Sequence, residues 1–155
     1  MKKFIFFIFP TFILSSCITS HSTATKTGTI KPVEVFGIPK PTSPYSLGIW
    51  GGDNFYLAGQ LGTDPVTGKL IDKSFTDEAD TVMKNLEKVL KSAGLDFSNV
   101  VKTTVYLTDL KDFQAMNDVY KTYFKNGQFP ARETVQVLGL MRGAHIEISM
   151  VACRK

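Results

Sequence analysis

An arginine and a glutamate near the C-terminus are the two residues best suited to chemistry on a small anion. Arg132 begins a strand-like run at residues 132–137, and Glu147 lies in a second run at residues 145–152. A guanidinium can bind a carboxylate through two parallel hydrogen bonds, and a glutamate can orient water and transfer a proton. Because side chains alternate along a strand, we expect the guanidinium and the carboxylate to face a common space.

The alternative is a salt bridge between Arg132 and Glu147, across the sheet or between subunits, and the residue types alone favour it. Other kinds of site lack the necessary residues. Two histidines and Cys153, the one cysteine besides Cys17, cannot form a usual zinc site, and the sequence has no nucleophile elbow, phosphate loop or dinucleotide fingerprint. His145 shares the Glu147 face, where we expect it to be solvated. The chemistry that remains requires neither a metal nor an organic cofactor.

The elements that must position these residues follow from periodicity. Apolar residues at helical spacing, ending at Gly94, predict a helix from Ser74 or Thr76 to about Ala93. We expect a second helix from about Lys111 to Phe124. The predicted strands are residues 33–36, 55–58, 100–107, 132–137 and 145–152. This order predicts one sheet in an α+β or α/β layer, with both helices on one face. The other face, carrying Arg132 and Glu147, would be uncovered and favours an oligomer.

The N-terminus has the pattern of a bacterial lipoprotein leader. Two lysines precede an apolar run at residues 4–14, and Leu14-Ser15-Ser16-Cys17 looks like a lipobox. We therefore expect residues 1–16 to be a signal peptide, residues 17–32 to be a lipidated Cys17 with a flexible tether, and residues 33–155 to be the folded domain. Cys17 would anchor the protein in the cell envelope, facing the periplasm or the exterior. The alternatives are an uncleaved membrane anchor or an incorrect start site.

Charge and cysteines narrow the range of partners. The formal net charge of +4 falls to +2 on removal of residues 1–16, because this segment contains Lys2 and Lys3 but no aspartate or glutamate. Basic residues are scattered without interleaved aromatics, so we expect no nucleic-acid partner. With Cys17 lipidated, Cys153 stands alone and no internal disulfide is expected.

An ordered set of short motifs across residues 33–155 resembles the RidA family of small imine deaminases. The matching pieces are Pro44-Tyr45-Ser46, Gly59-Gln60, Asn85-Leu86, Ala93-Gly94-Leu95, residues 101–107, Phe113, Met116-Asn117, Tyr120, Phe124, Pro130-Ala131-Arg132, Gly143-Ala144 and Ile146-Glu147-Ile148. The resemblance implies a chorismate-mutase-like α+β fold, with a mixed sheet of about six strands and two helices on one face. It also implies a homotrimer whose sheets form a central barrel, with ligand pockets between subunits.

The resemblance further implies hydrolysis of 2-imino acids, such as 2-iminobutanoate and 2-iminopropanoate, to 2-oxo acids and ammonia. Arg132 would bind the substrate carboxylate and Glu147 would orient water, while Tyr45 and Asn117 match positions that line the pocket. Gly59 would allow close backbone approach.

A purely structural role remains open for three of these residues. Tyr45 could pack on the core, Asn117 could hydrogen-bond to backbone at an interface, and Gly59 could serve a turn without contacting the ligand. Two departures from the family pattern concern the substrate. Ala58 stands where active members often have serine, and Met141 lies in a segment that usually contains a proline. The alternative function is therefore a non-catalytic module that binds small carboxylates in the envelope.

Overall fold

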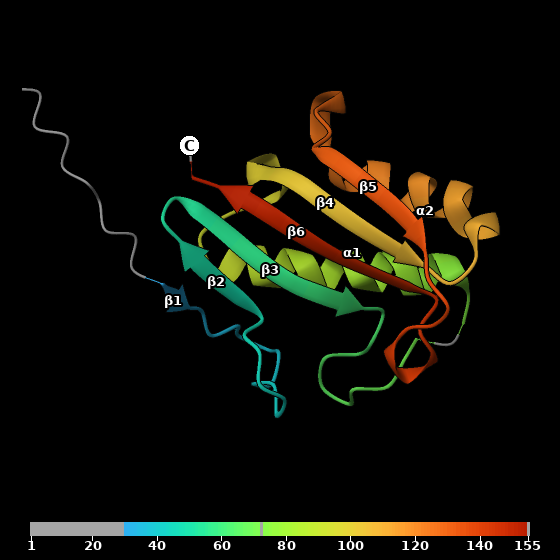
Figure 1. The fold of residues 1–155 in the computed structure, drawn as a ribbon, viewed down its shortest axis with the longest axis horizontal. Coiled ribbons are helices and arrows are strands. Elements are labelled where there is room, and N and C mark those ends of the chain that lie inside the picture. Colours follow the sequence, from blue (N-terminus) through green and yellow to red (C-terminus); the bar gives the residue numbers. More distant parts are fainter. Residues whose placement is uncertain (1–29, 72, 155) are drawn as a thin grey trace, which may run out of the picture.

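The computed structural model describes residues 30–71 and 73–154, which form a six-stranded mixed sheet with two α-helices (Figure 1). The predicted signal peptide, Cys17 and the tether up to residue 29 lie outside the described residues. Within the described ranges, no helix is both long and apolar enough to cross a membrane. The predicted α+β architecture is confirmed.

The sheet has the strand order β1-β2-β3-β6-β4-β5. Its strands are β1 (Lys31–Pro32), β2 (Gly48–Gly51), β3 (Asn54–Leu61), β4 (Val100–Leu107), β5 (Ala131–Gln136) and β6 (Ile146–Cys153). Neighbouring strands are antiparallel except β4 and β5, which are parallel. That parallel pair needs a crossover, and the second helix is part of it.

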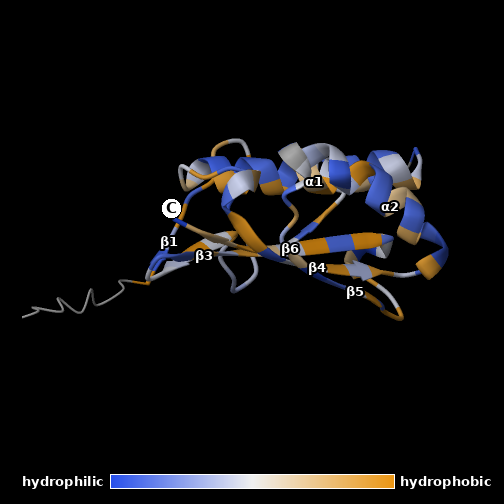
Figure 2. Cartoon of the chain, turned by 90° about the horizontal axis from the view of Figure 1, so that it is seen from above, coloured by the Kyte–Doolittle hydropathy of each residue, from blue (hydrophilic) through white to orange (hydrophobic). Residues whose placement is uncertain are grey.

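Helices α1 (Phe75–Ser92) and α2 (Phe113–Tyr120) both cover the same face of the sheet, as predicted (Figure 2). Ser74 begins α1 as its N-cap, and its hydroxyl accepts a hydrogen bond of 3.1 Å from the backbone N–H of Asp77. The apolar stripe of α1 is buried against the sheet, with Val82, Leu86 and Val89 fully buried. None of the described helices lies over the opposite face of the sheet (Figure 2).

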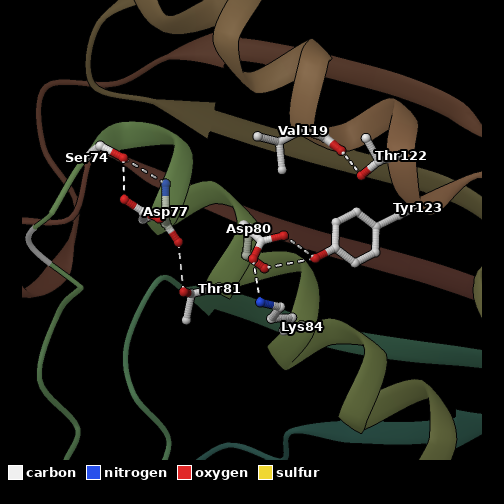
Figure 3. A network of polar contacts seen from close by, with 8 residues as sticks. All are labelled: Ser74, Asp77, Asp80, Thr81, Lys84, Val119, Thr122 and Tyr123. Atoms are coloured by element: carbon white, nitrogen blue, oxygen red, sulfur yellow. Dashed lines mark hydrogen bonds and ion pairs between the residues drawn. The ribbon is translucent and has the colours of Figure 1, made fainter.

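A polar contact fixes the C-terminal end of the α2 segment to α1 (Figure 3). The hydroxyl of Tyr123, in the turn after α2, donates to Asp80 Oδ1 at 2.5 Å, and Lys84 pairs with the same carboxylate at 2.6 Å. Burial and the hydrogen bond to Asp80 raise the pKa of the Tyr123 hydroxyl, which therefore stays protonated and donates. The contact helps to hold α2 in place over the sheet.

Several element boundaries differ from the prediction. Residues 33–36 are not a strand; pairing occurs two residues earlier, in β1, so the predicted tether extends into the sheet. Strand β2 was not predicted, because a four-residue segment with two glycines carries little periodic signal. Strand β3 continues past Gly59 to Leu61 through a β-bulge. The second helix is shorter than predicted, since 3-10 turns replace both of its ends.

Replacing Phe55 with alanine is expected to lower the free energy of unfolding by about 3–5 kcal/mol. Phe55 is fully buried, its ring lies 5.0 Å from that of Trp50, and it packs where a side chain at Gly48 would be. The measurement is urea unfolding, with Val66→Ala as the control because Val66 is 81% exposed. An equal effect of both changes would contradict this account of the core.

Candidate functional site

Arg132 lies on the edge strand β5 and points towards α2. It is directly opposite Thr103 of β4, which is fully buried under the helices. The guanidinium carbon is 4.9 Å from the ring centroid of Tyr120 and 5.7 Å from that of Phe113, and Nη1 is 3.8 Å from Met116 Sδ. The aromatic rings stabilise the cation through their faces. They also hold the guanidinium in place without using up its capacity to bind an anion.

The described ion pairs do not include Arg132, so no carboxylate in this part of the chain neutralises it. Two polar groups lie on neighbouring positions. Thr134 is on the same face of β5, and its Oγ1 is buried with no hydrogen-bond partner among the described residues. Asn117 follows Met116 on α2 and is half-buried. We call Arg132, Thr134 and Asn117 the arginine half-site, which has the chemistry to bind a small carboxylate.

Glu147 lies on β6 and points to the face of the sheet that the helices leave uncovered. Its neighbours Ile146 and Ile148 are buried on the helix face, so alternation puts Glu147 on the other one. A Cβ atom added to Gly59 would lie 1.9 Å from Glu147 Oε1, so the carboxylate occupies the space over that glycine. Burial raises the pKa of the Glu147 carboxyl, which suits a group that accepts and returns a proton.

The β-bulge in β3 contains both Ala58 and Gly59. The backbone N–H of Ala58 donates to the carbonyl of Leu47 at 3.0 Å, which ties the bulge to the segment just after Tyr45. Tyr45 is 54% exposed and forms part of the wall of a hollow of about 510 Å³ beside β1 and β2. We call Glu147, Gly59, Ala58 and Tyr45 the glutamate half-site, since all four belong to the β2-β3-β6 side of the sheet.

The prediction that Arg132 and Glu147 face a common space is wrong within one chain. Arg132 points to the helix face, Glu147 points to the opposite face, and strand β4 separates β5 from β6. The face of β5 is decided by its register with β4, and the polar sequence Ala131–Gln136 gave no apolar face from which to predict it. A salt bridge between the two residues within the chain is excluded by the same geometry.

A second correction concerns His145, which precedes β6 and does not share the Glu147 face. Its Nδ1 lies 2.8 Å from Oε2 of Glu78, a residue of α1 that the motifs in the sequence do not connect with the site. The available signal was that Glu78 falls on the buried stripe of α1 with Val82 and Val89. A charged residue on such a stripe indicates a buried polar partner.

A larger hollow of about 680 Å³ lies between the end of α1 and the turns after α2, and it contains none of the predicted site residues. Neither of these two hollows contains both Arg132 and Glu147. Among the residues that the structure describes, no three His, Cys, Asp or Glu side chains are grouped as metal ligands would be. The two half-sites are therefore the features of the chain that match the predicted chemistry.

Comparison with known proteins defines the class. The chain belongs to the family described as Endoribonuclease L-PSP, whose model matches residues 37–154. The chain is 46% identical over 114 residues to human 2-iminobutanoate/2-iminopropanoate deaminase, covering 74% of this chain and 82% of that protein. It is 43% identical over 122 residues to the mouse protein of the same name, and the match covers 79% of this chain and 90% of that protein. These matches confirm the family that the sequence motifs predicted.

Solved structures show the same fold. One is YyfA of Yersinia pestis, described as a member of the Rid protein family, with a TM-score of 0.78 and 35% identity over 81% of this chain and 100% of that one. Another is Escherichia coli TdcF with bound serine, with a TM-score of 0.76 and 32% identity. That match covers 81% of this chain and 99% of the TdcF chain. The predicted two-helix, six-strand arrangement is therefore that of its structural neighbours.

Proposed function

We propose that this protein hydrolyses reactive 2-imino acids, of the 2-iminobutanoate and 2-iminopropanoate type, to 2-oxo acids and ammonia. The observation that carries the proposal is the Arg132 guanidinium, which lies against two aromatic rings and has no carboxylate partner among the described residues. Relatives named as 2-iminobutanoate/2-iminopropanoate deaminases, at 43–46% identity, support it. A relative solved with bound serine supports an amino-acid-like ligand.

The active site of this proposal is shared between protomers. One chain holds its two half-sites on opposite faces of the sheet, so an arginine half-site can meet a glutamate half-site only from a second copy. The uncovered face also exposes apolar side chains, with Tyr56 46% and Val135 45% exposed, and a second copy would bury them. We propose a homotrimer in which each interface joins Arg132 of one protomer to Glu147 of the next.

The reaction needs a positioned water and a proton carrier. Arg132 binds the substrate carboxylate in a bidentate manner, which fixes the plane of the imine. Glu147 takes a proton from water as the water oxygen bonds to the carbon of the protonated imine, and the C=N electron pair moves to the nitrogen, which becomes a neutral amine. Glu147 then gives its proton to that nitrogen. The C–N bond breaks as the hydroxyl oxygen forms the C=O bond and passes its proton back to Glu147, and ammonia and the 2-oxo acid leave. Burial raises the pKa of Glu147, which makes its carboxylate a better proton acceptor than an ordinary glutamate.

A carboxylate-binding module without turnover is the second candidate, and Ala58 favours it. A hydroxyl at that position could hydrogen-bond the ligand, and its loss is worth about 0.5–1.5 kcal/mol. Saturable binding of a 2-oxo acid with no imine hydrolysis would support the module over the enzyme.

The direct test uses an amino-acid oxidase to generate the imine in the presence of the purified protein. We expect imine decay to accelerate in proportion to the protein concentration, measured by trapping the remaining imine as a semicarbazone. Decay at the rate of buffer alone would refute the enzymatic proposal.

Replacing Gly59 with alanine is expected to lower kcat by about ten- to a hundredfold, because the new methyl group occupies the position of Glu147 Oε1 and must displace the catalytic group. The control is Gly139→Ala, since an added Cβ at Gly139 meets nothing within 4 Å. Equal kcat values for the two variants would contradict the placement of Glu147 over Gly59.

We also propose that Cys17 is lipidated and anchors the protein in the bacterial cell envelope. The support is the order of basic residues, apolar run and Leu14-Ser15-Ser16-Cys17 in the sequence. Labelled palmitate should enter the wild-type protein and be absent from Cys17→Ser, and the variant should leave the membrane fraction. Label retained in Cys17→Ser would refute the assignment.

A further inference from the structure

Glu78 is a buried carboxylate on α1, and it binds the chain at the start of β6. Glu78 is 1% exposed. Its Oε1 accepts hydrogen bonds from the backbone N–H groups of His145 at 2.8 Å and Ile146 at 3.3 Å, and its Oε2 lies 2.8 Å from His145 Nδ1. One carboxylate therefore binds three nitrogen atoms of two adjacent residues.

These bonds lie immediately before Glu147. Ile146 is the first residue of β6 and is opposite Leu107 of β4, and Glu147 is opposite Tyr106. A strand end held by two backbone hydrogen bonds cannot shift along its neighbour without breaking them. Glu78 thus fixes the point at which β6 begins and the position of the next residue, Glu147.

The same face of α1 also holds the end of β3, on the other side of Glu147. A Cβ atom added to Gly62 would lie 2.3 Å from Glu78 Cγ, so the backbone there packs directly on Glu78. About two helical turns further on, Asn85 Nδ2 donates to the carbonyls of Leu61 at 3.1 Å and Thr63 at 2.9 Å. The two strands that carry Gly59 and Glu147, β3 and β6, are therefore both attached to α1 by polar contacts.

An apolar residue could fill the space of Glu78, but it could not make these bonds. Burial of an ionised carboxylate is unfavourable unless it is hydrogen-bonded, and removal of Glu78 would leave the N–H groups of His145 and Ile146 without their acceptor. The buried carboxylate is thus suited to specifying one position of the strand end.

We propose that Glu78 is a positioning residue for catalysis, which holds the end of β3 and the start of β6 so that the Glu147 carboxylate lies over Gly59. The role rests on the proposed function, because it concerns the turnover step assigned to Glu147. Glu78 acts at a distance from the arginine half-site, so it affects the water and the proton and leaves carboxylate binding unchanged.

The test compares Glu78→Leu, which removes the acceptor, with Glu78→Gln, whose amide oxygen can still accept from both N–H groups. Val89→Ala is the matched control, because it creates a cavity at a fully buried position in the C-terminal half of α1 without removing a hydrogen-bond acceptor. At a temperature where all variants are folded, we expect Glu78→Leu to lower kcat at least tenfold with KM within twofold of wild type. Glu78→Gln should restore kcat to within threefold, and Val89→Ala should leave it unchanged.

A second readout does not depend on turnover. The titration of the Glu147 carboxyl carbon, followed by NMR, should shift towards the ordinary glutamate range in Glu78→Leu, and amide exchange at Ile146 and Glu147 should quicken. Neither should change in Val89→Ala. If the wild type hydrolyses no imine, the proposed function fails and this titration alone decides the role of Glu78.

An unchanged Glu147 titration in Glu78→Leu would overturn the proposal, whatever the activity. A kcat loss no larger than that of Val89→Ala would overturn it as well. If Glu78→Leu fails to fold, Glu78→Asp takes its place, because its carboxylate is one methylene too short to reach the strand end.

Discussion

Replacing Arg132 with alanine is expected to lower kcat/KM for 2-imino acids by about 100- to 1000-fold. The change removes two charge-assisted hydrogen bonds to the substrate carboxylate, worth about 3–4 kcal/mol together. Most of the loss should appear in KM, since the water and its proton acceptor are untouched. The measurement is steady-state kinetics of imine decay with the oxidase-coupled assay, together with calorimetric binding of a 2-oxo acid.

Arg154→Ala is the matched control for this change. Arg154 is also an arginine stacked on an aromatic ring, 3.9 Å from the centroid of Trp50, and it lies outside both half-sites. Its loss should leave kcat/KM within twofold of wild type. Arg132→Ala enzyme that keeps a third or more of wild-type kcat/KM would show that this guanidinium does not bind the substrate.

Replacing Glu147 with glutamine should lower kcat by about 100- to 10,000-fold, the usual contribution of a general acid–base group. KM should change little, because the carboxylate of the substrate binds elsewhere. In the wild type, the lower limb of the pH profile of kcat/KM should report a carboxyl with a raised pKa, as burial of Glu147 predicts. That limb should be absent from the residual activity of the variant.

The control is Glu133→Gln, another glutamate on the uncovered side of the sheet, which forms an ion pair with Lys102 at 2.8 Å. Equal losses in the two variants would indicate a general effect of charge on that face. A Glu147→Gln enzyme with wild-type kcat would exclude this residue as the proton carrier.

Local signals were sufficient to predict the central elements. Helix α1 carries an N-cap serine, a continuous apolar stripe and a glycine at its end, and β4 is a β-branched run whose predicted range, residues 100–107, matches the structure. Each of these patterns depends on neighbours within a few residues. The assignment of both helices to one face also followed from the sequence, because only one face of the last strand is apolar at every position.

The relation between the two half-sites was not predictable in this way. Alternation along each strand is compatible with Arg132 and Glu147 on the same face, but it cannot say which face of β5 meets the helices. That depends on the pairing of Arg132 with Thr103, residues 29 apart in the chain. The role of Glu78 also depends on a contact between distant segments, from α1 to the start of β6. Such relations follow from register and packing, which a short window of sequence does not contain.

The central claim is that each active site joins Arg132 of one protomer to Glu147 of another, and subunit mixing tests it most directly. Arg132→Ala and Glu147→Gln proteins, each nearly inactive alone, are co-expressed with different tags and the mixed oligomers are purified. In a trimer that contains both variants, one of the three interfaces joins an intact Arg132 to an intact Glu147, so we expect about a third of wild-type kcat per site. Mixed oligomers that remain as inactive as either parent would contradict a site shared between subunits.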